Sequence, residues 1–153
     1  MKLEGEQFLN ADPMTVWAAL FDREVLAAAI PGCESLDQIS DTEFAAVVKL
    51  KVGPVSARFK GDVVLSDIVP GQSCILSGKG AGGIAGFAKG AAQVTLTPEG
   101  TGVRLRYDAD VAVGGKLASL GSRLIKSTAQ KLTGAFFTNL SEILAVPEAV
   151  GPA

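Results

Sequence analysis

Residues 103–113, VRLRYDADVAV, and residues 116–144, KLASLGSRLIKSTAQKLTGAFFTNLSEIL, decide the fold of this 153-residue chain. In the first stretch apolar residues alternate with charged ones, and a period of two predicts a strand with one dry face and one wet face. In the second, apolar residues recur every three or four positions, which predicts one amphipathic helix. Such a helix of 29 residues would be about 43 Å long, roughly the diameter of a compact domain of this size. We therefore expect the helix to cross a whole sheet and to cover its dry face.

The alternation of residues 103–113 also occurs earlier in the chain, over residues 44–52 and 55–65. Each of these segments predicts a strand, because one set of alternate positions is apolar and the other carries charged side chains. Turn residues divide the region between 33 and 113 at Ser40-Asp41, Gly53-Pro54, Pro70-Gly71, Gly82-Gly83 and Pro98-Glu99-Gly100. Consecutive strands joined by short turns predict an antiparallel sheet, here of about seven strands.

The N-terminal region predicts a strand over residues 1–9 and two short helices, over 14–21 and 23–30. Asp12 is a candidate N-cap before a proline at the first helical position, and Asp22 can cap the second helix. The fold class is therefore α+β, with a curved antiparallel sheet around a long C-terminal helix and two short helices after the first strand. We expect one domain over residues 1–146 and a flexible tail over residues 147–153, which are rich in Pro, Gly and Ala.

Composition excludes several classes of function. The net charge of −2 and the pI near 5.1 lack the basic excess of a nucleic-acid binder, so we expect no nucleic-acid partner. The chain has no histidine, which removes Ser-His-Asp and Cys-His nucleophilic sites and histidine metal sites. We expect no catalytic residues, no metal and no covalently bound cofactor. Two isolated cysteines and no apolar run of spanning length predict a cytoplasmic protein with buried, reduced thiols.

Residues 78–83 read GKGAGG and formally match the glycine pattern of dinucleotide-binding proteins. That motif needs a long helix directly after it, whereas here the strand pattern resumes. The structural interpretation is a glycine-rich hairpin that bends the sheet or admits another group closely. Small residues continue to Ala92 and leave volume unfilled.

An interior lined by small residues, in a chain with only nine aromatic residues, predicts an apolar cavity between the sheet and the long helix. The candidate ligand-binding residues are Phe44, Phe59, Phe87 and Tyr107 from strands and Leu117, Leu120 and Leu124 from the helix. For each residue alone, ordinary core packing is the competing interpretation. Gly114 and Gly115 would form a hinge before the helix, and ligand would enter near its N-terminal half.

The opposite face of the predicted helix is basic. Its charged residues are Lys116, Arg123, Lys126 and Lys131. A solvated face is the simpler interpretation. The alternative is contact with anionic lipid or an acidic partner, since each basic group near an anionic surface contributes about 1 kcal/mol.

Several motifs together resemble one known family. They are Ile30–Glu34 (IPGCE), Gly53–Val55 (GPV) leading to Phe59–Gly61 (FKG), Gly86–Gly90 (GFAKG), and Val113–Leu117 (VGGKL) running to Leu120–Leu124 (LGSRL). On these the chain resembles the G-type subunits of aerobic carbon monoxide dehydrogenase, within the START-like, helix-grip (SRPBCC) superfamily. The resemblance implies a helix-grip fold with an internal apolar cavity. It also implies carbon monoxide dehydrogenase subunits as partners and peripheral contact with the inner face of the cytoplasmic membrane.

Three hypotheses for function follow. The leading one is a non-catalytic accessory protein that holds a hydrophobic small molecule, quinone or lipid-like, and links the molybdenum-containing dehydrogenase to the membrane. The alternative is an adaptor that recruits the dehydrogenase to the membrane by surface contacts, with a packed interior. The third is a START-like enzyme, which would need polar residues converging inside the cavity.

Overall fold

The computed structural model describes residues 1–145, so the predicted tail at 147–153 lies outside the described residues. Twelve elements follow one another along the chain. They are β1 (Lys2–Leu9), α1 (Pro13–Leu20), α2 (Arg23–Ala29), β2 (Cys33–Ser40), β3 (Glu43–Val52), β4 (Val55–Val69), β5 (Ser73–Ala81), the short 3-10 turn η1 (Gly83–Ala85), β6 (Phe87–Glu99), β7 (Gly102–Gly114), α3 (Lys116–Ser119) and α4 (Ser122–Ala145).

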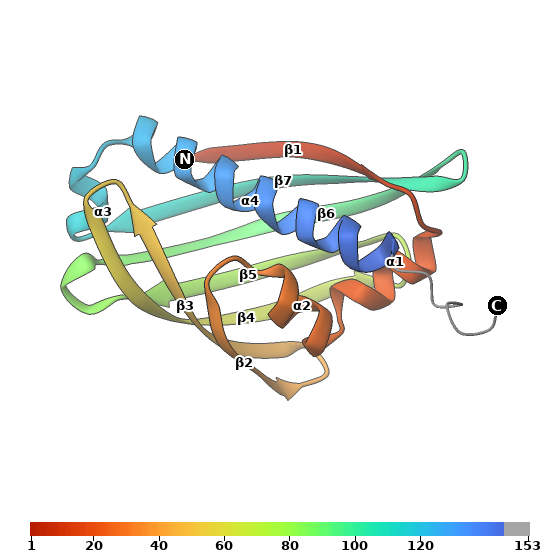
Figure 1. Cartoon of the computed structure of the whole chain (residues 1–153), viewed down its shortest axis with the longest axis horizontal. Coiled ribbons are helices and arrows are strands. Elements are labelled where there is room, and N and C mark those ends of the chain that lie inside the picture. Colours follow the sequence, from red (N-terminus) through yellow and green to blue (C-terminus); the bar gives the residue numbers. More distant parts are fainter. Residues whose placement is uncertain (146–153) are drawn as a thin grey trace.

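The seven strands form one antiparallel sheet in the order β1-β7-β6-β5-β4-β3-β2. Every neighbouring pair from β2 to β7 is joined by a short turn, and β1 closes the row by pairing with β7. The sheet curves around α4, which crosses its concave face diagonally, while α1 and α2 lie beside the C-terminal end of α4 (Figure 1). The predicted α+β helix-grip architecture is confirmed.

The two short helices begin at their predicted capping residues. The Asp12 carboxylate accepts a hydrogen bond from the Thr15 backbone N–H at 3.1 Å, and Pro13 occupies the first helical position. Asp22 accepts from the backbone N–H of Glu24 at 2.9 Å. Each carboxylate satisfies an N–H that has no partner within its helix.

The predicted 29-residue helix is wrong in one respect, because it is broken at Gly121. The chain forms α3, turns at Leu120 and Gly121, and restarts as α4, which has 24 residues. Gly121 has a φ of +90°, a conformation that ends a helix and that glycine adopts at little cost. Helical spacing of apolar residues continues across the break, so the periodicity did not reveal it.

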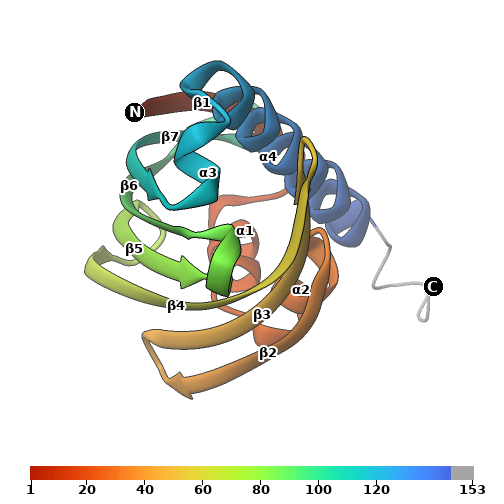
Figure 2. The same ribbon diagram turned by 90° about the vertical axis from the view of Figure 1, so that its left-hand side faces the viewer.

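The interior contains two separate apolar clusters. The larger joins α1, α2 and most of the sheet to the C-terminal half of α4 through Phe137 and Leu140. The smaller lies where the β3–β4 turn meets α3 and the start of α4, and we call it the end cluster. Its members are Val52, Leu117 and Ile125, with Met1, Phe59, Val113 and Leu120 packed against them. Viewed from that end, η1 and α3 lie in front of the interior (Figure 2).

Two glycines allow the η1 turn to pack directly on the backbone after β7. Gly86 has a φ of +111°, and a Cβ there would collide with the Gly114 carbonyl oxygen. A Cβ on Gly115 would lie 2.6 Å from the Gly86 Cα. The close approach expected for the glycine-rich hairpin is therefore present, and it ties η1 to the junction that we expected to act as a hinge.

Substitution of Gly86 by alanine should lower the free energy of unfolding by about 3 kcal/mol, because it combines backbone strain with a collision against Gly114. The matched control is Gly100→Ala. Gly100 has a φ of +59° and no atom within 4 Å of a built Cβ, so only the left-handed conformation, about 1 kcal/mol, is penalised. Urea denaturation of both variants measures the difference, and equal losses would contradict the close packing.

Candidate functional site

A cavity of about 470 Å³ lies between the concave face of the sheet and the C-terminal half of α4. Its volume falls in the range of about 300–1,000 Å³ that small-molecule sites usually have. Its walls come from three regions. They are Leu3, Glu4, Leu36, Phe44, Ala46, Val63, Leu65, Cys74, Leu76, Ala92, Val94, Leu105, Tyr107 and Ala109 of the sheet; Leu20, Phe21, Leu26, Ile30 and Pro31 of α1, α2 and the residues beside them; and Ala129, Gln130, Leu132, Thr133, Phe136 and Phe137 of α4.

Small side chains on facing elements create this space. Ala92 of β6 lies directly opposite Ala109 of β7 in the sheet register, and Leu76 of β5 lies on its other side. Ala129 of α4 lines the same cavity from the helix side. Three alanines on facing elements leave a gap that larger residues would close.

The cavity is open to water. Leu76 alternates along β5 with buried Cys74 and lines the cavity, yet 36% of its surface is exposed. A dry void of about 470 Å³ would cost about 11 kcal/mol at about 24 cal/mol per Å³, which is as large as the whole stability of a typical domain. Solvent access removes that penalty, and an apolar ligand that replaces the water is favoured.

Aromatic side chains form the wall at the C-terminal half of α4. The rings of Tyr107 and Phe137 stack with centroids 6.1 Å apart, and Phe136 meets Phe137 edge-on at 5.2 Å. Tyr107 lies across β1 because its cross-strand neighbour is Gly5, where a Cβ would be 2.5 Å from the tyrosine hydroxyl oxygen. The hydroxyl is therefore carried to the β1 side of the cavity.

Polar groups are few, and most lie at the rim. Glu4 and Gln130 are exposed, while the Thr133 hydroxyl donates to the Ala129 carbonyl oxygen at 2.8 Å. With the Tyr107 hydroxyl these are the polar side chains of the lining. An arrangement of this kind binds an apolar body and leaves its polar end near water.

The structure brings two of the seven predicted residues to this cavity, Phe44 and Tyr107. Phe59, Leu117 and Leu120 belong instead to the end cluster. Leu124 packs against Gly53 at the β3–β4 turn. Phe87 lies on the other face of the sheet, is 48% exposed and covers Gly114.

The differences have two physical causes. In β6 the inward positions are those of Ala92 and Val94, so Phe87, an odd number of residues away, points outward. The break at Gly121 also turns α3 away from the line of α4, so the leucines before it do not extend the lining. Gln130, predicted to lie away from the apolar side of the helix, in fact borders the cavity.

Sequence reasoning missed the contributions of α2 and of Phe137. A usable signal was present, since Ala129 is a small residue located before the aromatic pair 136–137 on the same helix. Leu26 and Ile30 gave none, because a short helix with few apolar residues does not show which layer it joins.

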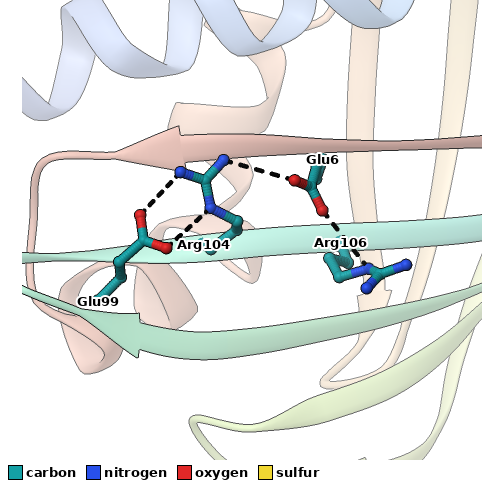
Figure 3. A network of polar contacts seen from close by, with 4 residues as sticks. All are labelled: Glu6, Glu99, Arg104 and Arg106. Carbon is teal, nitrogen blue, oxygen red and sulfur yellow. Dashed lines mark hydrogen bonds and ion pairs between the residues drawn. The ribbon is translucent and has the colours of Figure 1, made fainter.

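Most ion pairs of the described residues lie on the convex face of the sheet, away from the cavity. The Arg104 guanidinium donates two hydrogen bonds to Glu99, at 2.7 and 3.1 Å, and lies 3.7 Å from Glu6, which also meets Arg106 at 3.7 Å (Figure 3). The hydrogen bonds from Arg104 hold the pKa of Glu99 below its usual range. These four charges compensate one another on an exposed surface.

Cys74 provides a chemical probe of the cavity. Burial raises the pKa of its thiol, and burial is also the main reason that the pKa of Cys33 is raised. Cys33 is not part of the lining. A raised pKa leaves less thiolate at about pH 8, and only the thiolate reacts rapidly with maleimides.

In a Cys33→Ser protein, Cys74 should react with N-ethylmaleimide about tenfold more slowly than in the urea-unfolded chain, with a rate that rises as pH increases toward the raised pKa. An apolar probe such as anilinonaphthalene sulfonate should slow it further. The control is Cys74→Ser, in which the probe should leave the labelling of Cys33 unchanged. Mass spectrometry follows the reaction, and no protection of Cys74 would place the probe elsewhere.

Among residues 1–145, no helix combines the length and hydropathy needed to cross a membrane.

Comparisons with known proteins agree with this fold. The family model for CoxG, described as the G-type subunit of carbon monoxide dehydrogenase, matches residues 5–145. A conserved protein from Geobacillus kaustophilus has a crystal structure with a TM-score of 0.89 and 28% identity, covering 95% of each chain. A protein from Mycobacterium smegmatis is similar at a TM-score of 0.72 and 11% identity, over 96% of this chain and 92% of that one. Ara h 8.0201 is similar at 0.66 and 14%, over 96% and 99%. No curated protein matches.

Proposed function

The chain belongs to the CoxG family of carbon monoxide dehydrogenase subunits, whose model spans residues 5–145, and from this we propose an accessory protein that binds an apolar ligand for an aerobic, molybdenum-containing carbon monoxide dehydrogenase. The observation that carries the proposal is the cavity of about 470 Å³ with apolar walls and a polar rim. Family membership supports the accessory role, and the helix-grip fold supports ligand binding.

The lining favours a ligand with a flat or extended apolar body and a small polar end. Tyr107 and Phe137 offer aromatic surface, against which a ring can stack. Gln130 and the Tyr107 hydroxyl offer hydrogen bonds near the rim. A quinone or a lipid-like molecule has this form, and it is the ligand class that we propose.

A carrier of such a molecule would connect the dehydrogenase with the membrane in which the molecule is dissolved. In this proposal the partners are the dehydrogenase subunits and the inner face of the cytoplasmic membrane, and contact with the membrane is peripheral. The competing adaptor function requires a filled interior, and the open cavity argues against it.

The direct experiment is mass spectrometry of organic extracts from the purified protein. A quinone or lipid recovered in near-equal amount to the protein, and displaced by an added quinone analogue, would support the carrier. Extracts without any apolar molecule, together with no binding of quinone analogues or fatty acids, would favour the adaptor.

Replacing Ala92 by phenylalanine should reduce the affinity for a short-chain quinone at least tenfold, because the ring would occupy the space beside Ala109. The matched control is Ala91→Phe, one residue earlier on the exposed face of the same strand. Quenching of Trp17 fluorescence measures binding, since its ring lies 5.0 Å from that of Phe21 in the cavity wall.

Both variants should keep the parent's cooperative unfolding, as Ala92→Phe fills space that is already open. If both bind the quinone as tightly as the parent, the ligand lies outside this cavity. The carrier proposal would then lose its main support.

A further inference from the structure

One end of the molecule exposes large apolar side chains at a narrow tip. Ile84, in the η1 turn between β5 and β6, has 88% of its surface exposed, and Phe87 at the start of β6 has 48%. The tip lies at the same end as α3 and the β3–β4 turn (Figure 1 and Figure 2). Exposed apolar side chains that gather at one place mark an interaction surface more often than singly scattered ones do.

Basic side chains surround this tip. On the convex face of the sheet the register sets Lys79 of β5 directly opposite Lys89 of β6, and Lys49 of β3 opposite Arg58 of β4. Like charges directly opposite each other destabilise a sheet, so fold stability does not account for the pair of lysines. We call this region the basic end; its basic residues are Lys49, Lys51, Arg58, Lys60, Lys79, Lys89, Lys116, Arg123 and Lys126.

These charges are largely uncompensated within the described part of the chain. Arg58 pairs with Glu34 at 2.6 Å, and none of the other eight forms an ion pair there. The acidic residues nearby are few. Asp62 lies opposite Lys79 in the register, and Asp110 is engaged by the N-terminal amine at 3.3 Å. The contrast is with Arg104 and Arg106 toward the other end, whose charges meet Glu6 and Glu99 (Figure 3).

The basic end also adjoins the interior of the fold. Phe59 of the end cluster packs beneath Gly82, which leads into η1, so that a Cβ on Gly82 would lie 2.7 Å from its ring. The end cluster contains no polar side chain. Apolar contact is therefore continuous from the exposed tip to the inside of the sheet at this end.

We propose that the basic end docks on an anionic lipid bilayer, with Ile84 and Phe87 inserted at the headgroup boundary and the surrounding lysines and arginines facing lipid phosphates. A bilayer accepts a projecting tip without a complementary groove, whereas a protein partner would need one. The charge is complementary to such a surface although the whole chain carries −2. This inference rests on the proposed function and adds to it the surface that meets the membrane, where an apolar ligand would be collected.

Sedimentation with vesicles tests the docking surface. The full chain should bind vesicles of equal parts phosphatidylglycerol and phosphatidylcholine, bind pure phosphatidylcholine much more weakly, and lose the difference at high salt. Ile84→Asp should weaken binding at least tenfold. The matched control is Ile39→Asp, which changes an isoleucine of 62% exposure on β2, outside the basic end.

A second pair of variants tests the charges. Lys79→Ala/Lys89→Ala should weaken binding to the anionic vesicles about 30-fold, because each basic group near such a surface is worth about fivefold. Arg23→Ala/Arg106→Ala removes the same charge outside the basic end and should have a much smaller effect. All variants concern exposed side chains, so unchanged unfolding by urea serves as the folding control.

The outcomes separate this inference from the proposed function. If Ile84→Asp and the lysine variant bind anionic vesicles like the parent, or if the chain binds no vesicles while the basic end retains a purified dehydrogenase, the lipid proposal is overturned. Quinone binding measured by Trp17 quenching should stay unchanged in these variants. Its loss in Ala92→Phe should, in turn, leave vesicle binding intact, so each proposal fails by its own measurement.

Discussion

The packing of the C-terminal half of α4 on the concave face of the sheet is the contact on which the rest of this structure depends. Leu140 has no exposed surface, and Phe137 retains 7% while stacking on Tyr107 at 6.1 Å. The amide of Asn139 adds a hydrogen bond to the Ala29 carbonyl oxygen at 3.0 Å, which ties α2 to the same helix. Burial of these large side chains supplies most of the free energy that holds helix and sheet together.

This strong anchor at one half of α4 allows the region beside it to remain open. Ala92, Ala109 and Ala129 face one another where larger residues would complete a core. Cores are normally filled to crystal-like density, and a gap of this size lowers stability. A wall of firmly packed aromatic residues beside a gap bounded by alanines is the arrangement expected of a preformed binding site, since the ligand then needs little rearrangement of the protein.

The distribution of charge follows the two ends of the molecule. Toward one end, arginines and glutamates satisfy one another across β1, β6 and β7. At the other, lysines from β3, β4, β5 and β6 share one surface with exposed Ile84. A net charge near zero for the whole chain conceals this separation, because composition adds charges that lie on different surfaces. The early exclusion of nucleic acid relied on the total, and the sheet register shows where the positive charge collects.

The sequence alone determined the elements and the fold class, because the period of two, the period near 3.6 and the capping residues Asp12 and Asp22 are local properties of the chain. It also indicated an interior with small side chains. Only the tertiary structure decided which residues face that interior. Phe87 is separated from Ala92 by an odd number of positions along β6, and Gly121 interrupts a helical pattern whose spacing continues through it. The parity of a strand and the direction of a helix after a glycine depend on partners distant in the chain, so the cavity lies beside Phe136 and Phe137 and not beside Leu117 and Leu120.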